Sequence, residues 1–244
     1  MFYFDDFHGK KILKSTLLKD YDCFFTTRDF VLTPSSREDL IEVAKENRCF
    51  LEEKLNSKIT TCEQTHSDNV QVIEKSNYFY KNTDALISKI ENSTLLMNFA
   101  DCVPVILYSK KDNIGAIAHA GWRGTAQNIV EKTIKQMDIN PHNITALIGP
   151  SISKCCFETG EEVFKQLIKN EKDNKLYEQK NEKYFIDLKK LNYNQLKKMG
   201  VEEIDVCSYC TCCMSDIFFS YRKEKGLTAR HSAIIKIKGD KICQ

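Results

Sequence analysis

The sequence predicts a single α+β domain, and three observations lead to this fold class. Short runs rich in apolar and β-branched residues alternate along the chain with stretches in which apolar residues recur at helical spacing. The 244 residues are 42% hydrophobic, which is enough to bury a large core. No internal repeat, low-complexity linker or break in composition divides the chain, so we expect residues 1–244 to form one domain.

Strands are expected where apolar, aromatic and β-branched residues cluster. The runs at 103–108 and 114–119 are almost continuously apolar, which is typical of strands covered on both faces. The complete set of expected strands comprises 21–32, 70–73, 95–100, 103–108, 114–119, 144–148, 217–221 and 232–237.

Helices are expected where the apolar period changes to that of a helix. A start signal at Ser35-Ser36-Arg37-Glu38 precedes a helical pattern that reaches Leu51. Further helices are expected at 125–138, 161–168 and 188–199, the last one ended by Gly200. The polar segment 171–184 is expected to be a surface loop or a helix end.

Composition excludes several classes of partner. The net charge is only +2, which does not favour a nucleic acid or a membrane surface. The N-terminus lacks a basic region followed by an apolar run, and no apolar stretch approaches the roughly 18 residues of a membrane span. We therefore expect a cytoplasmic protein whose 11 cysteines are thiols, ligands or nucleophiles rather than disulfides.

Three separate elements offer metal ligands. They are His66 in Gln64-Thr65-His66, Cys102 within the apolar stretch 99–107, and His119 at the start of His-Ala-Gly-Trp-Arg-Gly. One thiolate and two imidazoles suit zinc with one coordination position left open. Spacing alone does not establish the site, because no short C-x-x-C…H-x-x-x-H pattern links these residues, and each one alone fits a core histidine or an inert buried thiol.

The turn after His119 is a candidate anion site. Glycines let the backbone approach a ligand closely, and the helix expected to begin near Thr125 offers free N–H groups beside Arg123. Phosphate is the expected ligand of such a site. The alternative is a tight turn with a solvated Arg123.

A second group of cysteines lies near the C-terminus. Cys207 and Cys210 form a C-x-x-C pair that is followed by Cys212 and Cys213. This group suits either a structural zinc or a crowding of thiols at a strand end. Because no second cluster with matching spacing is evident, we expect these cysteines, and the pair at 155–156, to be dispensable for chemistry and to hold no second zinc.

Six motifs occur in the order found in one known family. The chain resembles the YfiH-type laccase-domain family, described as multicopper polyphenol oxidase-like proteins and also as purine nucleoside phosphorylases. The resemblance rests on Gln64-Thr65-His66, Ala100-Asp101-Cys102-Val103-Pro104-Val105, His119-Ala120-Gly121-Trp122-Arg123-Gly124, Ile148-Gly149-Pro150-Ser151-Ile152 with Cys155-Cys156-Phe157-Glu158, Asp187-Leu188 with Asn192 and Gln195-Leu196, and Phe218-Phe219-Ser220-Tyr221-Arg222.

The resemblance implies mixed β-sheets packed between helices in α/β/β/α layers, and a catalytic zinc held by His66, Cys102 and His119. It also implies phosphorolysis of adenosine, inosine and methylthioadenosine, and deamination of adenosine. In these reactions phosphate attacks C1′ of the ribose, or water attacks C6 of the adenine ring.

Other site roles are assigned from residue type. Arg123 and Arg222 are candidates for holding phosphate, Gln64 for contacting a base edge, and Asp101 for supporting the metal site or carrying a proton. The expected partners are purine nucleosides and phosphate, and the expected state is a monomer or a weak homodimer.

The chain departs from the family pattern at several positions. Ser67, Ser153 and Ala229 stand where the family usually has glycine, which matters if those positions need a positive φ. The segment 29–32 replaces a Gly-Gly-Val-Ser stretch after Arg28, and this puts its contribution to substrate contact in doubt.

Two alternative functions come from other reaction classes. A copper-dependent polyphenol oxidase of the multicopper type needs many imidazoles, often as His-x-His, whereas this chain has five histidines and no His-x-His. A single Cu²⁺ held by two histidines and one cysteine remains open. The other alternative is a metal-free hydrolase with Cys102 as the nucleophile and His119 as the base.

Overall fold

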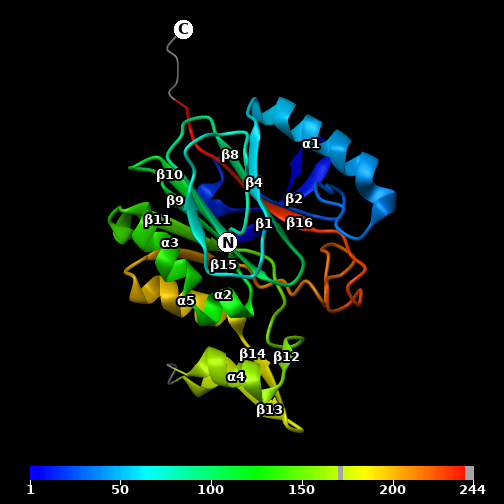
Figure 1. Ribbon diagram of the computed structural model, residues 1–244, viewed down its shortest axis with the longest axis vertical. Coiled ribbons are helices and arrows are strands. Elements are labelled where there is room, and N and C mark those ends of the chain that lie inside the picture. The colour runs from blue at the N-terminus through cyan, green and yellow to red at the C-terminus, as the bar shows by residue number, and fades with distance from the viewer. Residues whose placement is uncertain (170–172, 240–244) are drawn as a thin grey trace.

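Two β-sheets packed face to face form the centre of the molecule, with helices on both outer faces (Figure 1). The computed structural model describes residues 1–169 and 173–239. The inner faces meet in a buried core to which Phe25 and Met97 contribute from one sheet, and Ile106 and Ile117 from the other. Apolar side chains on both facing surfaces explain why the central strands are rich in valine, isoleucine and leucine.

The first sheet has seven strands and includes both the first and the last strand of the described residues. Its strands run antiparallel except for β4, which pairs in parallel with β8 and β6. In spatial order they are β1 (Phe2–Phe7), β2 (Lys10–Ser15), β3 (Cys23–Thr26), β16 (His231–Lys236), β8 (Thr94–Phe99), β4 (Ile59–Cys62) and β6 (Phe79–Tyr80).

The second sheet has six strands and an antiparallel centre. Its two edge strands, β15 and β5, each pair in parallel with their neighbour. In spatial order the strands are β15 (Glu203–Val206), β11 (Ile144–Ile148), β9 (Val103–Ser109), β10 (Ile114–Ala120), β7 (Ala85–Ser88) and β5 (Val70–Val72).

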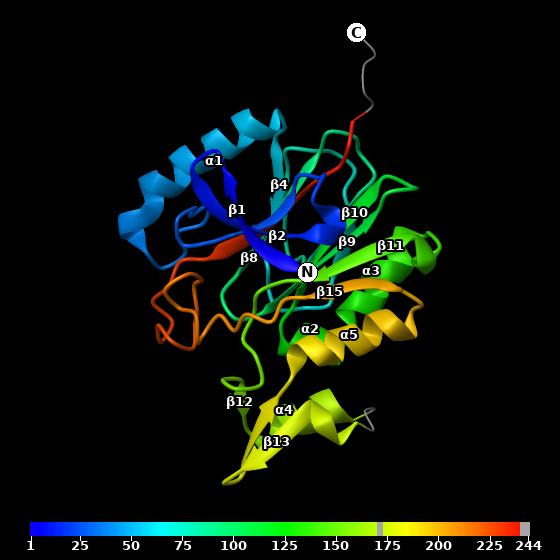
Figure 2. The same cartoon turned by 180° about the vertical axis from the view of Figure 1, so that it is seen from behind.

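Helices cover the two outer faces. Helix α1 (Ile41–Leu55) packs its buried leucines against the seven-stranded sheet. The six-stranded sheet is covered by α2 (Trp122–Ala126), α3 (Ile129–Met137) and α5 (Leu188–Lys198). Figure 2 shows the same arrangement from behind, with α1 on the opposite side of the sheets from α3 and α5.

A small unit projects from one end of the molecule (Figure 1). It contains α4 (Glu161–Ile168) and a three-stranded antiparallel sheet in the order β12 (Glu158–Thr159), β14 (Lys183–Ile186), β13 (Tyr177–Lys180). Single turns of 3-10 helix lie at Asn174–Leu176, directly before β13, and elsewhere at Thr16–Leu18, Glu38–Leu40 and Pro141–Asn143.

This architecture confirms the predicted α+β class and its layers. The strands expected at 95–100, 103–108, 114–119 and 144–148, and the helices expected at 161–168 and 188–199, are present with ends shifted by at most one residue. Gly200 ends α5 with a φ of 89°. Among the described residues, no helix has both the length and the apolar character that crossing a membrane requires.

The predicted strand at 217–221 is wrong, because these residues lie in a series of turns. Phe218 and Phe219 are both buried, but they point into two different hydrophobic clusters. Their apolar character therefore reflects burial from a turn and not an extended strand. Similarly, only Cys23–Thr26 of the predicted strand 21–32 is a strand, while Phe30 and Leu32 reach the core from a loop.

Two predicted helices differ in extent. The helix at 125–138 is divided into α2 and α3 at Asn128, whose φ of 60° is a left-handed conformation that asparagine tolerates. The helix predicted from Ser35 begins at Ile41. Ser36 does not cap it, because its hydroxyl is hydrogen-bonded to the backbone of Thr228.

The polar segment 171–184 was expected to be a loop or a helix end, but it contains β13 and the start of β14. Residues 171 and 172 lie outside the described residues. The β1–β2 hairpin and strands β4, β7 and β15 were also not predicted. These strands are short or partly polar, so their sequences carry a weak apolar signal.

Close packing at Gly149 generates a stability prediction. A Cβ atom there would lie 2.3 Å from the ring of Phe25, which is fully buried between the sheets. Gly149→Ser should therefore lower the free energy of unfolding by about 1–3 kcal/mol through overpacking. Gly160→Ser is the control, because a Cβ there meets nothing within 4 Å and serine is a good helix N-cap. Equal unfolding free energies for the two variants in denaturant titrations would contradict the prediction.

Candidate active site

The three predicted ligands come together where the two sheets meet. His119 lies on β10, and the antiparallel register pairs it with Pro104 on β9, so Cys102 stands at the same end of the sheet. His66 approaches from the loop after β4 with a φ of 59°. The donor atoms of the three side chains all lie within 4.8 Å of one another.

A buried carboxylate that the sequence did not reveal holds both histidines. Asp84 immediately precedes β7 and is fully buried. Its oxygens accept hydrogen bonds from the backbone N–H groups of 65–67, from the Ser67 hydroxyl at 2.6 Å and from His119 Nδ1 at 2.8 Å. One side chain thus fixes the His66 loop and orients the His119 ring.

The bond to Asp84 also selects the tautomer of His119. With Nδ1–H directed at the carboxylate, Nε2 is the nitrogen left for a ligand, as in many carboxylate–histidine–metal arrangements. Burial by itself would raise the pKa of Asp84, but the hydrogen bonds from His119 and Ser67 outweigh it and lower the pKa. Asp84 therefore stays ionised.

The charges around Cys102 favour its thiolate. Burial raises the pKa of the thiol, but the neighbouring His119 and His66 outweigh this effect and lower the pKa to about 6. In turn, burial lowers the pKa of His119, whereas Cys102 and Asp84 raise it to about 9. The metal-free site is thus a thiolate–imidazolium pair in which the soft sulfur ligand is already deprotonated.

These residues fit a zinc ion. They supply one thiolate and two imidazoles, the ligand types that zinc prefers, and a carboxylate fixes the orientation of one ring. Gly121 keeps the space beside them free, because a Cβ there would lie 3.1 Å from Cys102 Sγ. The three side chains leave the fourth position of a tetrahedral ion open.

All three ligands line one cavity of about 520 Å³, a size suited to a small molecule. Its wall combines apolar and polar groups. The other lining residues that bear on ligand binding are Gln64, Asn98, Asp101, Trp122, Ile152, Phe157, Leu188, Tyr221, Arg222 and Arg230.

Two of the predicted polar residues line the cavity while making structural contacts. The Gln64 amide donates to the Asn98 carbonyl and accepts from the Asn98 N–H, both at 2.8 Å. The Asp101 carboxylate accepts from the Thr211 hydroxyl at 2.6 Å and from the Arg222 N–H at 2.7 Å. Both side chains therefore connect segments that form the cavity wall.

The arginines are placed differently from one another. Arg123 is not among the cavity-lining residues, and its guanidinium lies 4.3 Å from the centre of the Trp122 ring. Arg222 lines the cavity and donates to the carbonyls of Cys156 and Glu158. Arg230, which sequence reasoning missed, also lines the cavity and is half-buried.

The departures from the family pattern have structural roles. None of Ser67, Ser153 and Ala229 adopts a positive φ, so the missing glycines cause no backbone strain. Ser67 bonds to Asp84, and Ser153 Oγ accepts from the Lys189 ammonium. The segment 29–32 does not line the cavity; Phe30 and Leu32 pack near α1 instead.

The cysteines near 207–213 separate into different environments. Cys210 and Cys213 lie beside Cys155 and Cys156, whereas Cys207 is buried in the core between the sheets. The structure thus shows a partner pair that the sequence spacing did not reveal, whereas the expectation that these cysteines hold no second zinc stays a prediction. The pairing was invisible in the sequence because the two halves are more than 50 residues apart.

Comparison with solved structures places this architecture in a known class. YlmD from Geobacillus stearothermophilus superposes with a TM-score of 0.86 at 26% identity, covering 97% of this chain and 99% of that chain. A YfiH protein from Bacillus licheniformis gives a TM-score of 0.85 at 28% identity, with 96% and 99% covered. The fold thus defines a YfiH-like protein.

The chain belongs to the multi-copper polyphenol oxidoreductase laccase family, whose sequence profile matches residues 6–238. It is 34% identical over 189 residues to the Escherichia coli protein named purine nucleoside phosphorylase YfiH, with 77% of each chain covered. It is 30% identical over 212 residues to purine nucleoside phosphorylase YlmD of Bacillus subtilis, covering 79% of this chain and 76% of that one. The resemblance found in the motifs is confirmed.

The lowered pKa of Cys102 predicts its reactivity in metal-free protein. After chelation, alkylation at Cys102 should accelerate between about pH 5 and about pH 7 and then level off, because the thiolate forms around a pKa of about 6. Peptide-level mass spectrometry would follow the modification. Asp84→Asn should move the midpoint to higher pH, since the amide no longer favours the protonated His119. A wild-type midpoint near 9 would contradict this account.

Proposed function

We propose that this protein is a zinc-dependent purine nucleoside phosphorylase that also deaminates adenosine. The substrates are adenosine, inosine and methylthioadenosine, which yield the free base and ribose 1-phosphate or its methylthio analogue. The observation that carries the proposal is the ligand set His66, Cys102 and His119 at the wall of a cavity of about 520 Å³. The names of the Escherichia coli and Bacillus subtilis relatives support the reaction class.

In the proposed phosphorolysis, a phosphate oxygen forms a bond to C1′ of the ribose as the bond from C1′ to the purine nitrogen breaks. The departing base takes up a proton. In deamination, water adds at C6 of adenine and ammonia leaves. When bound, zinc supplies a Lewis acid that stabilises negative charge developing on an oxygen.

The protein's own residues bind and orient the reactants. Asp84 keeps His119 in one tautomer, and Asp101 fixes the backbone of Arg222 beside the cavity. Trp122 and Phe157 offer apolar surface for a purine ring. Gln64 keeps its proposed role at a base edge, although both ends of its amide already bond to Asn98.

Phosphate, in this proposal, binds near Arg222 and Arg230, which both line the cavity. Burial lowers the pKa of Arg230, but an arginine remains charged in proteins, so it can pair with an anion. Arg123 is the alternative phosphate contact. It would act from beside Trp122, at the edge of the cavity wall.

A metal-free cysteine hydrolase is a second candidate because of one observation. Cys102, His119 and Asp84 form a chain in which a thiol stands next to an imidazole that is hydrogen-bonded to a carboxylate. Turnover that survives complete removal of metal by a chelator would favour this reading. Turnover that is lost with the metal and regained with zinc favours the phosphorylase.

The unpaired state of all ten cysteines in the described residues is consistent with a reducing compartment, and we propose a cytoplasmic location. The proposed assembly is a monomer or a weak homodimer, which analytical ultracentrifugation would test.

Product analysis tests the reaction. With phosphate, the purified protein should convert adenosine to adenine and ribose 1-phosphate; without phosphate, only inosine should form. Cys102→Ser should abolish both reactions, because it removes the single thiolate ligand of the metal. Cys49→Ser, at an exposed position on α1, should not alter either rate. Failure to form any purine product, together with copper-dependent oxidation of a phenol, would favour the copper enzyme instead.

A pair of arginine variants tests the phosphate contact. Arg230→Gln should raise the KM for phosphate by roughly tenfold or more and leave the KM for adenosine nearly unchanged, because a charge-assisted contact to the anion is lost. Arg123→Gln is the matched variant outside the cavity lining and should have a small effect. The opposite result would place the anion at the turn after His119. Equal changes in both KM values for Arg230→Gln would indicate a role in holding the loop.

A further inference from the structure

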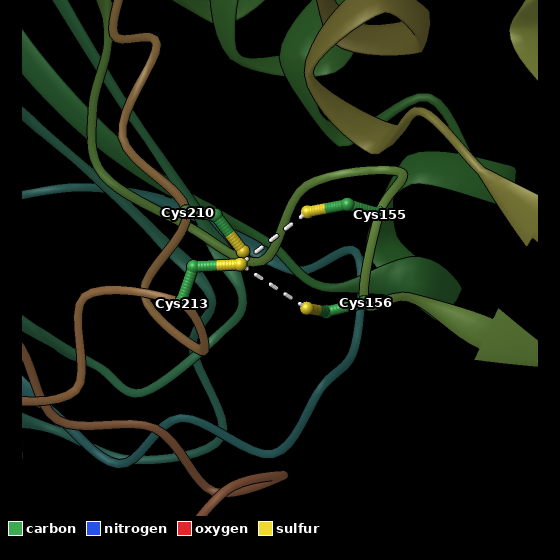
Figure 3. Close-up of side chains that lie close together, drawn as sticks. All are labelled: Cys155, Cys156, Cys210 and Cys213. Carbon is green, nitrogen blue, oxygen red and sulfur yellow. Dashed lines mark hydrogen bonds between the residues drawn. The ribbon is translucent and has the colours of Figure 1, made fainter.

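Four cysteine thiols face one another outside the proposed active site (Figure 3). Cys155 and Cys156 come from the loop between β11 and β12, and Cys210 and Cys213 from the segment after β15. All four sulfur atoms lie within 4.8 Å of one another. None of these four residues lines the cavity that contains His66.

The sulfur spacing matches a metal site. Cys213 Sγ lies 3.7 Å from Cys155 Sγ and 3.5 Å from Cys156 Sγ. A tetrahedral zinc with Zn–S bonds of about 2.3 Å separates its sulfur ligands by roughly 3.8 Å. Cys210 and Cys213 have C-x-x-C spacing, which is common for two ligands of one structural zinc.

The backbone holds the two segments together at this point. Ser151 and Cys210 form a parallel β-bridge, and the N–H of Thr211 donates to the Ser151 carbonyl at 3.1 Å. The N–H of Ser153 donates to Cys210 Sγ at 3.4 Å, a contact that favours a thiolate. The β-bridge and the Thr211–Ser151 bond, which do not involve the thiols, therefore bring the two segments together.

A buried lysine, Lys189, bonds to the two segments that carry the cluster. The Lys189 side chain is only 5% exposed, and its ammonium donates to Ser153 Oγ and to the carbonyls of Cys207 and Tyr209. These acceptors lie on the same two segments that carry the thiols. A zinc ion with four thiolates has a net charge of −2, so a nearby ammonium would offset part of that charge.

We propose that Cys155, Cys156, Cys210 and Cys213 bind a structural Zn²⁺ ion. Four sulfur ligands close the coordination sphere, so this ion would carry no substrate, in contrast to the three-ligand site. The proposal does not depend on the purine nucleoside activity, because the four thiols, the backbone contacts between their segments and Lys189 all lie outside the cavity lining.

The position of the cluster suggests what the ion would hold in place. Ile152 and Phe157, on either side of the cysteine pair, line the cavity, and the Cys156 carbonyl accepts from the Arg222 guanidinium. Thr211, between the other two ligands, donates to Asp101. A zinc ion would therefore tie together the two segments that form this side of the pocket.

Metal analysis of the full-length protein, purified with zinc and a reductant, tests the proposal. The wild type should contain about two zinc ions per chain. Cys102→Ser and Cys155→Ser should each lower this to about one, and the double variant to nearly none. Cys49→Ser is the control, since Cys49 is exposed on α1 and belongs to neither ligand group, and it should keep both ions.

Cobalt gives a readout that is independent of activity and of the other site. Co²⁺ added to metal-free Cys102→Ser protein should produce the intense sulfur-to-metal charge-transfer absorption of a tetrathiolate, and the further change Cys155→Ser should weaken it. Cys155 is exposed, so this change should not prevent folding. The proposal fails if the wild type holds a single zinc that only Cys102→Ser removes, if the four sulfurs hold iron, or if mass spectrometry finds them joined as disulfides under reducing purification.

Discussion

The candidate active site depends on one buried ionic group, the carboxylate of Asp84. A charged side chain that is removed from water is costly unless hydrogen bonds replace its hydration. Asp84 obtains these bonds from the loop that carries His66 and from the ring of His119. Its main-chain carbonyl also accepts from the His119 N–H at 2.8 Å. The need to satisfy one carboxylate thereby places two imidazoles next to Cys102.

The same principle extends to the wall of the cavity. Asp101, with a φ of 83°, accepts from Thr211 and from the backbone of Arg222, and so brings the turns after β15 against the loop that holds Cys102. The turns at 210–226 contain no strand, so side-chain hydrogen bonds to Asp101 and the bridge between Ser151 and Cys210 hold them against the neighbouring loops. An active-site wall made of loops can vary in sequence while the two sheets behind it stay the same.

The sequence predicts those features of the structure that depend on residues close together in the chain, and not those that depend on distant partners. Long apolar runs such as 103–108 and 114–119 define buried strands locally, and the candidate ligands His66, Cys102 and His119 were recognisable from residue type and motif. Asp84 was not recognisable, because an aspartate before a short strand looks like any polar loop residue until its partners are known.

Two other features could not be predicted from the sequence, because their structural role depends on residues that are distant in the chain. The four-thiol cluster combines two pairs that each seem incomplete alone. The Phe218-Phe219 pair looks like a strand because burial, and not extension, determines its composition. In both cases the same local sequence fits more than one structure, and only the tertiary contacts determine which one forms.

The position of the ligands across both sheets has a consequence for folding. His66 follows β4 of the seven-stranded sheet, whereas His119 on β10 and Asp84 before β7 belong to the six-stranded sheet, and Cys102 lies on the connection from β8 of the first sheet to β9 of the second. No single hairpin contains the site, so its geometry is complete only when the two sheets are packed together. A metal ion bound there, as proposed, would bind the native state and not partly folded forms, and by mass action it would stabilise the native state.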